Sequence, residues 1–483
     1  MATIDLLIFI TYMLLMLGVG FYFHRKNTNL EDYYVGGRNM GKWHIGLSVV
    51  ATDVGGGFSI GLGGLGFLIG LSGSWMLFTG LLGALISGVF LIPRIKKLSD
   101  KQKFFTFPEV FRFYFGPKAA LLAGLISGIG YLGFASSQLL AGAKLASAAF
   151  IDLDFTLALI IMGFVAVVYT VMGGIKAVIY TDTFQWILLM AGLIFIAIPM
   201  AWVAVGGWEK ISASLPQEFF TFNNLSWQQL LNWMVTILPI WFVGMTLYQR
   251  IYASRSAAEA RKAWYIAGIF EWPIMAFMGV GLGMLARVAF VEGMFIPLGF
   301  AQGETFDAEM GLPLLLRTIL PAGLMGLVLS AYFSAILSTA DSCLMASSSN
   351  IMHDLIQRLM PKMFKTDSIM MWSKVLTLLL GIVAVLIAMK LTEVLSLMLY
   401  SYAFMVSGLL VPLIAAIFFM QRSELAALSA MIAGGGTTLT LLFFNISLPL
   451  GLDANIFGIL ASLFTFLTII IFKQRLKHEN SNF

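Results

Sequence analysis

Long apolar runs divide this 483-residue chain into candidate membrane-spanning helices. A run of about 18 or more apolar residues is long enough to cross a bilayer as a helix. Because the ninth run is overlong and contains Pro321, we expect a short helix there, followed by a span from about residue 322. The pattern predicts an all-α integral membrane protein with about thirteen transmembrane helices, at residues 4–23, 44–70, 74–93, 119–149, 155–173, 179–204, 228–249, 264–288, 313–350, 371–389, 393–419, 424–444 and 455–472.

The composition supports this class. Hydrophobic residues make up 59% of the chain and charged residues 11%, whereas soluble proteins carry about 25% charged residues. The net charge of +5 is modest and is spread over many short loops, so we expect a lipid bilayer and not nucleic acid as the surrounding partner. No loop is long enough for a soluble domain. We therefore expect residues 1–483 to form one transmembrane domain that acts as a monomer.

The basic residues predict the orientation of the chain in the membrane. If the amino terminus lies outside, 24 of the 29 lysines and arginines fall on the inner side, and Arg250 is among them. Positive residues are concentrated in the cytoplasmic loops of membrane proteins. We therefore expect a plasma-membrane or inner-membrane protein whose amino terminus is outside and whose carboxyl terminus is in the cytoplasm.

The second apolar run is interrupted by glycines and a carboxylate. Gly55, Gly56 and Gly57 weaken the helix, because glycine loses more backbone freedom on folding than other residues. Asp53 is costly at membrane depth unless it faces a cavity, an ion or a partner. Lipid cannot satisfy the backbone groups that a broken helix frees, so these groups must line a polar site. We interpret residues 47–60 as the centre of an ion and solute site.

A second interruption lies in the seventh run, where Pro239 and Gly244 are near the middle of the helix. Five helices separate the two interruptions, and an odd number reverses the topology, so residues 44–204 and 228–419 could form an inverted pair. A leading helix and inner loop at 4–43 would precede the pair, and two helices with a short tail at 420–483 would follow. Interrupted helices at matching positions of inverted repeats indicate the midplane site of a transporter. The alternative is that proline and glycine merely kink these helices.

The ninth run carries a carboxylate and several hydroxyl groups on one helical face. Ser338, Asp341 and Ser342 share this face and Thr339 is adjacent. Hard cations such as sodium prefer oxygen ligands. Serine and threonine in membrane helices also bond back to their own helix and pack closely against neighbours. Because Asp341 lies among the hydroxyls, we favour the ion-binding interpretation.

Three other charged residues lie within apolar runs. Asp182 is expected near the start of the sixth helix, after a turn at Gly173–Gly174. It could be an acid favoured by the helix macrodipole or a guide for a cation leaving inward, and both interpretations remain open. Glu271 and Lys144 are interpreted as paired or snorkelling structural charges.

Taken together, several motifs resemble the sodium:solute symporter family along nearly the whole chain. They are Asp32-Tyr-Tyr-Val-Gly-Gly-Arg38, the Ala51-Thr-Asp-Val-Gly-Gly-Gly57 break, Met172-Gly-Gly with Tyr180-Thr-Asp-Thr-Phe-Gln185, Tyr248-Gln-Arg250 and Leu337-Ser-Thr-Ala-Asp-Ser342. The resemblance implies the leucine-transporter type of inverted five-plus-five helix repeat, with one extra helix before it and two after. It also implies import of a small organic solute by sodium-coupled symport and alternating access, with Na+ as the coupling ion.

The resemblance also implies two groups of ion ligands. The main sodium site would fall on the backbone carbonyls of Ala51, Val54 and Ala335 and on the hydroxyls of Ser338 and Thr339. A second sodium site or exit path would fall on Asp182, Ser338, Asp341 and Ser342. Asp341 departs from the sialic acid member of the family, which has a serine at this position.

The solute is less defined than the ion. Asp53 matches the proline transporters of the family, which favours an amino acid, a zwitterion or a quaternary amine. The alternatives are a neutral or carboxylate solute, such as a sugar, vitamin or short organic acid, and a channel or passive uniporter on the same scaffold. We expect no enzyme, because no nucleophile–base or metal set is visible. The expected solute residues are Asp53, Gly55, Gly56, Gly57, Phe58, Tyr131, Phe134, Gln138, Trp241 and Met245.

Overall fold

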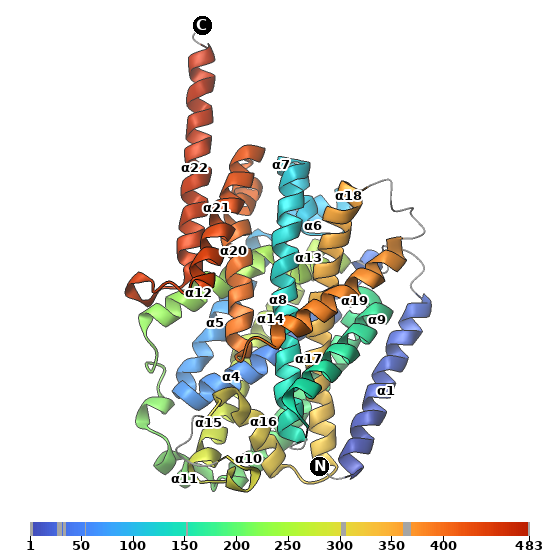
Figure 1. Ribbon diagram of the computed structural model, residues 1–483, viewed down its shortest axis with the longest axis vertical. Coiled ribbons are helices and arrows are strands. Elements are labelled where there is room, and N and C mark those ends of the chain that lie inside the picture. The colour runs from blue at the N-terminus through green and yellow to red at the C-terminus, as the bar shows by residue number, and fades with distance from the viewer. Residues whose placement is uncertain are drawn as a thin grey trace.

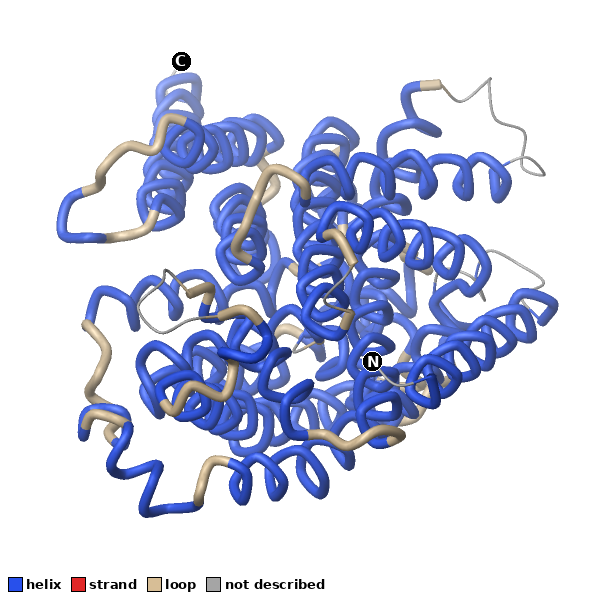
Figure 2. Tube along the Cα trace, turned by 60° about the horizontal axis from the view of Figure 1, so that its bottom comes forward, coloured by secondary structure: helices blue, strands red, loops and turns tan. Residues whose placement is uncertain are grey.

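The computed structural model describes residues 3–26, 31, 35–53, 55–150, 153–300, 306–360 and 369–481. Over these ranges the chain consists of helices joined by short loops (Figure 2), and it contains no β-strand. An isolated bridge joins Met40 and Ser254. The predicted all-α class is confirmed.

The helices of the first half of the chain are α1 (Thr3–Lys26), α3 (Lys42–Asp53), α4 (Gly56–Ile69), α5 (Trp75–Phe90), α6 (Ile92–Gln102), α7 (Pro108–Phe115), α8 (Pro117–Ala149), α9 (Phe155–Gly192), α10 (Ile198–Ala204) and α11 (Gly207–Ser214). Those of the second half are α12 (Trp227–Val243), α13 (Met245–Ala253), α14 (Ala257–Phe270), α15 (Phe277–Val291), α16 (Ala308–Ile319), α17 (Leu324–Ser349), α18 (Gln357–Leu359), α19 (Ile369–Ala388), α20 (Val394–Phe419), α21 (Glu424–Phe443) and α22 (Ala454–Ser481). The π-helical segments are η3 (Leu193–Ala197), η5 (Glu271–Ala276) and η7 (Asn350–Ile356).

Helices α8 and α17 run through the middle of the molecule, while α1 and α22 lie at its two flanks (Figure 1). Helix α17 packs against α8, α9 and α1, and α8 also packs against α20. The side chains of α17 are almost all buried, which is why this helix can carry so many polar groups away from lipid. The two ends of the chain lie at opposite ends of the molecule (Figure 1).

The expected number of thirteen spans is not confirmed. Among the described residues, 9 helices are long and apolar enough to cross a membrane, or up to 10 if one bent pair is counted as a single span. One reason is that α4 and α5 are joined by a short 3₁₀ turn at Gly70–Ser74 and so form a single apolar stretch. In addition, this count leaves out the shorter apolar stretches Thr3–Met16 within α1 and Phe155–Val171 within α9.

The first predicted break is present, between α3 and α4. Helix α3 ends at Asp53 and α4 begins at Gly56. Gly55 lies between them with φ −42° and ψ −169°, which is not helical. A Cβ atom at Gly55 would overlap Thr339 Oγ1 and would lie 2.8 Å from Thr339 Cβ. The absence of a side chain at Gly55 therefore allows the break to approach α17 closely.

The second predicted break is also present, but its cause differs from the expectation. Pro239 lies inside α12, which continues to Val243. The helix stops at Gly244, whose ψ of 112° is extended, and α13 then begins at Met245 with a bend of 40°. Proline is tolerated within a membrane helix where neighbouring groups satisfy the freed carbonyl. The glycine and not the proline therefore marks the second break.

Two further expectations concern the sixth and ninth runs. The ninth divides as predicted, because α16 ends at Ile319 and α17 begins at Leu324 after Pro321. In contrast, α9 is one helix from Phe155 to Gly192, so the turn expected at Gly173–Gly174 is absent. Asp182 consequently lies within a helix, and its interpretation as an acid at a helix amino terminus is wrong.

Candidate functional site

Three oxygen atoms meet where the first break contacts α17. The Thr339 hydroxyl donates to the Ala51 carbonyl at 3.1 Å and to the Ala335 carbonyl of its own helix at 3.2 Å. All three residues are buried. One hydroxyl proton shared between two carbonyls leaves acceptor capacity unused, and such a cluster of oxygens suits a hard cation. Val54, the fourth predicted ligand, lies outside the described residues.

Ser338 is the remaining residue of the predicted main sodium site. In the structure its hydroxyl donates to Asp182 Oδ1 on α9. Ser338 thus stands between the two predicted ion sites, next to Thr339 in sequence and hydrogen-bonded to an acid of the second site. Because Ser338 donates only its proton to Asp182, the lone pairs of its oxygen stay available to a cation at the first break.

Asp182 is the centre of a polar cluster that joins four helices. Ser48 of α3 donates to its carboxylate, as does Ser338 of α17. The Arg250 guanidinium of α13 forms an ion pair with it at 3.1 Å, and both side chains are fully buried. One half of each broken helix, α3 at the first break and α13 at the second, is therefore tied to Asp182.

Arg250 occupies the middle of the predicted second ion site. Its Nη2 atom donates to Thr52 Oγ1 at 2.6 Å and to Ser342 Oγ at 3.0 Å. Its Nε atom donates to Ser48 Oγ at 3.1 Å. Arg250 was expected in an inner loop, but its side chain is completely buried among these hydroxyls. The Tyr248-Gln-Arg250 motif was the only sequence signal that could have indicated this role.

Asp341 lies on the same helix as Ser342 but faces α9. Its Oδ1 atom accepts from Thr170 Oγ1 at 2.5 Å. No hydrogen-bond donor in the described part of the chain reaches Oδ2, although Asp341 is fully buried. Two of the predicted second-site residues, Asp182 and Ser342, thus meet at Arg250, while Asp341 makes a separate contact.

Tyr131 of α8 closes the second break. Its hydroxyl lies 3.0 Å from Thr246 Oγ1 and accepts from the Thr246 backbone N–H at 3.2 Å. This amide is one that the start of α13 leaves without a partner inside the helix. Phe134, one turn further along α8, packs edge-on against Tyr402 with ring centroids 5.0 Å apart. The Asp53 carboxyl acts electrostatically on Tyr131 and Tyr402, so these side chains surround one region.

The other predicted solute residues are distributed more widely. Trp241 packs edge-on against Trp264 of α14 and touches α5 at Gly83. Met245 Sδ accepts from the Phe107 backbone N–H at 3.1 Å. Gln138 is buried on α8 and donates to Ser137. Gly56 and Gly57 form the first turn of α4, and the Phe58 side chain lies outside the described residues.

Glu271 was interpreted as a structural charge, and the structure instead places it against Asp53. It begins the π-helical segment η5, and only 1% of its surface is exposed. Asp53 acts electrostatically on its carboxyl group, and neither of its carboxyl oxygens has a hydrogen-bond partner in the described part of the chain. The signal in the sequence was a carboxylate in an apolar run beside Pro273. Its partner is 218 positions away, so the contact could not be read from the sequence.

Lys144 is paired, as expected of a structural charge. Its Nζ atom lies 2.6 Å from Asp307 Oδ2 and 2.6 Å from Glu309 Oε2. Glu309 in turn accepts from the backbone N–H groups of Val394 and Leu395 at the start of α20. An acid at a helix amino terminus is favourable. The cluster joins α8, α16 and α20 at one end of the molecule.

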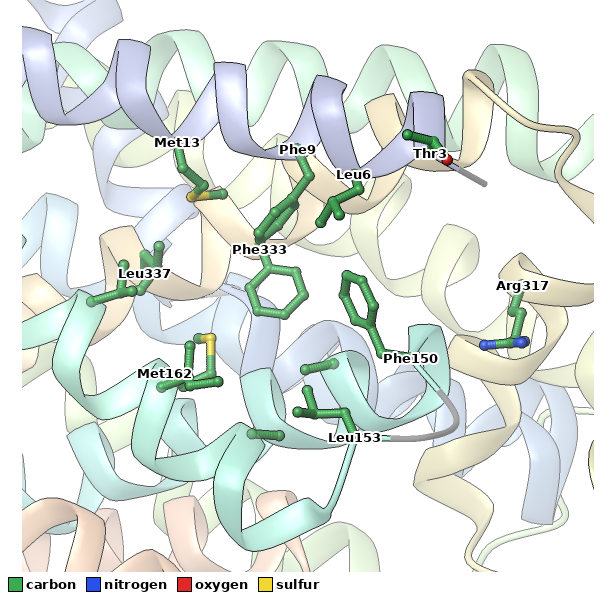
Figure 3. A pocket seen from close by; sticks show the side chains of 14 residues that line it. Thr3, Leu6, Phe9, Met13, Phe150, Leu153, Met162, Arg317, Phe333 and Leu337 are labelled. Carbon is green, nitrogen blue, oxygen red and sulfur yellow. The ribbon is translucent and has the colours of Figure 1, made fainter. Parts of the chain in front are cut away.

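A cavity of about 630 Å³ lies apart from these residues (Figure 3). It is bounded by α1, by the adjoining ends of α8 and α9, and by α17. Phe9, Phe150 and Phe333 form its walls, and Arg317 lies at one end. Its lining contains none of the predicted solute residues, and its apolar walls resemble a lipid-facing groove more than a polar site.

Known proteins are similar to this chain in sequence. The profile of the sodium:solute symporter family matches residues 33–434. The high-affinity proline transporter PutP of Bacillus subtilis (strain 168) is 27% identical over 468 residues, which cover 95% of this chain and 96% of that protein. The osmoregulated proline transporter OpuE of the same organism is 26% identical over 477 residues, with coverage of 96% and 94%. A sodium/proline symporter of Staphylococcus aureus (strain NCTC 8325 / PS 47) is 28% identical over 358 residues, with coverage of 71% and 66%.

Solved structures extend the comparison to the fold. A sodium-coupled sialic acid symporter in a substrate-bound outward-open state superposes with a TM-score of 0.80 at 22% identity, over 96% of this chain and 97% of that one. Mhp1, a nucleobase-cation-symport-1 family transporter, superposes with a TM-score of 0.58 at 14% identity, with coverage of 92% and 95%. The expected leucine-transporter type of fold is thereby confirmed.

The family match covers most of the chain and accounts for the two broken helices and the oxygen cluster between α3 and α17. It favours symport, with sodium as the coupling ion, over a channel or passive uniporter. This multi-pass membrane protein is a sodium-coupled solute symporter and belongs to the sodium:solute symporter family.

Proposed function

We propose that this symporter imports proline or a similar small zwitterionic amino acid together with sodium. The observation that carries the proposal is the first break, where the Thr339 hydroxyl meets the Ala51 carbonyl and Asp53 lies two residues further along. A cation site and a carboxylate are thus adjacent on one interrupted helix. The proline transporters among the relatives support the choice of solute.

The carboxylate suits the positive end of such a solute. Asp53 is 94% buried, and no basic side chain in the described part of the chain acts on its carboxyl group. A buried carboxylate without a basic partner is favourable only if a cation or a hydrogen-bond donor neutralises it. A secondary ammonium group would supply both. The Tyr131 region beside the second break would then hold the rest of the solute.

Sodium would act by stabilising one state of the transporter. In that state the carbonyls of Ala51 and Ala335 and the hydroxyls of Ser338 and Thr339 would hold the ion, which fastens α3 to α17. A ligand shifts a conformational equilibrium only by its difference in affinity between the states. The membrane potential adds about 2.3 kcal/mol per charge per 100 mV. We propose the predicted orientation, with the amino terminus outside, for this import.

Arg250 supports a stoichiometry of one sodium ion per cycle. Its guanidinium already supplies a positive charge to Asp182, Thr52 and Ser342. A second sodium ion at the same oxygens would face this charge at close range, which is unfavourable in a buried site. We expect uptake to depend hyperbolically on sodium concentration, and a sigmoidal dependence would contradict this stoichiometry.

Transport into proteoliposomes tests the proposal. The purified protein should concentrate radiolabelled L-proline when an inward sodium gradient is imposed, and should not do so with a potassium gradient. Asp53→Asn should weaken the apparent proline affinity, while the uptake that remains should still require sodium. Proline uptake that is equal in both gradients, or an affinity unchanged by Asp53→Asn, would contradict the proposal.

A further inference from the structure

The cavity beside α1 combines an apolar interior with one charged end (Figure 3). Its volume of about 630 Å³ is typical of pockets that hold small organic ligands. Phe9 and Phe333 pack edge-on in its wall, with ring centroids 5.1 Å apart. Among the described residues that line the cavity, Arg317 alone carries a charge. This arrangement suits a ligand with a long apolar part and an anionic end.

The cavity opens on a surface that faces lipid. Leu6 of α1 and Ile161 of α9 line it, although 41% and 46% of their surfaces are exposed. Phe333 and Leu337 of α17 also line it and are buried. The exposed apolar side chains of a membrane-spanning helix contact the hydrocarbon tails of the bilayer. A ligand therefore reaches this cavity from the bilayer, between α1 and α9, and not from the water.

The charged end of the cavity lies where several helices end. Thr3 begins α1, Phe150 directly follows α8, and Arg317 is in the last turn of α16. At the other end, Met13 and Leu337 lie inside α1 and α17 (Figure 3). The ends of membrane-spanning helices lie at the membrane surface, because hydrocarbon cannot satisfy their free backbone groups. Arg317 is therefore at the level of the lipid headgroups, and the cavity extends from there towards the middle of the bilayer.

The end of α8 holds the Arg317 side chain in position. Its Nη1 atom donates to the Ala148 carbonyl at 3.1 Å and to the Ala149 carbonyl. These carbonyls belong to the last turn of α8, where the helix itself provides no donor. Carbonyl groups are neutral, so these bonds leave the charge of the guanidinium in place. A guanidinium carries several N–H donors in a planar arrangement that matches phosphate oxygens, so Arg317 can bind the helix end and a phosphate together.

We propose that this cavity is a binding site for an anionic phospholipid. An acyl chain lies between α1, α9 and α17, and the phosphate lies on the Arg317 guanidinium. The single positive charge at the headgroup level favours a lipid with a net negative charge, such as phosphatidylglycerol, over a zwitterionic lipid, whose positive group offsets the attraction. The bound lipid joins α1 to α9 and α17, and so stabilises the folded transporter.

Native mass spectrometry of the purified protein, titrated with lipid, tests the site. Wild-type protein should bind phosphatidylglycerol more tightly than phosphatidylcholine with the same acyl chains. Arg317→Gln should weaken phosphatidylglycerol binding by about tenfold or more and remove this preference, because charge-assisted hydrogen bonds to the phosphate are lost. Arg287→Gln is the matched control, because Arg287 is also half-buried but lies over the Phe67 ring, outside the cavity. Equal affinity of wild type and Arg317→Gln for phosphatidylglycerol would overturn the proposal.

A second variant keeps the test decisive if Arg317→Gln does not fold. Ala158 of α9 is buried and lines the cavity, so Ala158→Phe should occupy the space of the acyl chain while Arg317 is unchanged. Phosphatidylglycerol should raise the unfolding midpoint of wild type in detergent, and this rise should be lost in Ala158→Phe. An equal rise in both proteins would overturn the proposal, as would an equal rise of the wild-type midpoint with inorganic phosphate alone.

Discussion

The two helix breaks are alike in position but differ in what surrounds them. At the first break, backbone carbonyls and Asp53 face Thr339 and Glu271, so oxygen acceptors are in excess over donors. At the second break, the freed amide of Thr246 is satisfied by the neutral hydroxyl of Tyr131. A site with more hydrogen-bond acceptors than donors attracts cations, whereas an uncharged site in which donors and acceptors are paired does not. The comparison assigns the ion to the first break and leaves the second for uncharged parts of the solute.

The same substitution at the two breaks should reduce uptake to very different extents, and this is the largest effect that we expect. A methyl group at Gly55 would overlap the Thr339 hydroxyl, whereas one at Gly244 would lie 3.0 Å from the Ile240 carbonyl and 3.1 Å from the Tyr131 hydroxyl. Gly55→Ala should abolish sodium-stimulated uptake, and Gly244→Ala should reduce it by less than about tenfold, since a small shift relieves the contact. Equal losses in the two variants would show that the breaks do not differ as we describe.

Arg250 connects the two breaks, because it lies on α13 and donates to Ser48 and Thr52 of α3. Arg250→Gln leaves the buried Asp182 carboxylate without its charge partner, which costs about 3–5 kcal/mol. We expect a large decrease in the midpoint of thermal unfolding in detergent. Adding Asp182→Asn should recover part of this loss. An unchanged midpoint in Arg250→Gln would mean that the ion pair does not hold α3, α9 and α13 together.

Removing the Tyr131 hydroxyl should affect the solute and not the ion. Tyr131→Phe loses its contacts with the Thr246 amide and hydroxyl, which together contribute about 1–2 kcal/mol, or roughly 5–30-fold in affinity. We expect this decrease in solute affinity with an unchanged sodium concentration for half-maximal uptake. Tyr114→Phe on α7 serves as a control away from both breaks. If the sodium dependence of Tyr131→Phe differs from that of wild type, the second break also contributes to ion binding, which would contradict this prediction.

The smallest expected effect lies outside the spans, at Glu109 of α7. Burial raises the pKa of Glu109. The ion pair with His353 at 3.6 Å and the hydrogen bonds from the Phe105 and Thr106 amides outweigh burial, so its pKa lies below the ordinary value. A group with a lowered pKa stabilises the fold at neutral pH, and this contribution is lost as the pH falls through that pKa. Glu109→Gln should therefore unfold at a lower temperature than wild type at neutral pH, and the difference should shrink in acid. Glu218→Gln, at an exposed position, should unfold at the same temperature as wild type. If the difference in unfolding temperature between Glu109→Gln and wild type becomes larger in acid, the pKa of Glu109 is not lowered as we describe.

The fold was predictable because apolar length and helix-breaking residues are local signals. Runs of apolar residues placed most helices, and Gly55 and Gly244 marked both breaks. The number of spans was less certain, because α4 and α5 join through a short turn and the turn expected at Gly173–Gly174 does not interrupt α9. A glycine pair can remain helical when neighbouring helices hold it, and the sequence does not show those neighbours.

The site was predictable only in part, because its contacts join residues that are far apart in the chain. Thr339 and Ala51 were grouped through the resemblance, and the structure brings them together. Arg250 and Glu271 were missed as site residues, because a charged residue near a helix end is normally interpreted as a loop residue or as a snorkelling side chain. Their partners, Asp182 and Asp53, lie 68 and 218 positions earlier. Only the packing of α3, α9 and α13 reveals these pairs.

A sodium titration of thermal stability tests the ion site at the first break most directly. Increasing sodium, against a potassium control, should raise the unfolding midpoint of the wild-type protein, because an ion that binds only the folded state stabilises it. Thr339→Val keeps the size of the side chain and removes the hydroxyl that contacts Ala51. We predict that this variant folds but no longer responds to sodium. The same sodium response in Thr339→Val and wild type would contradict the account.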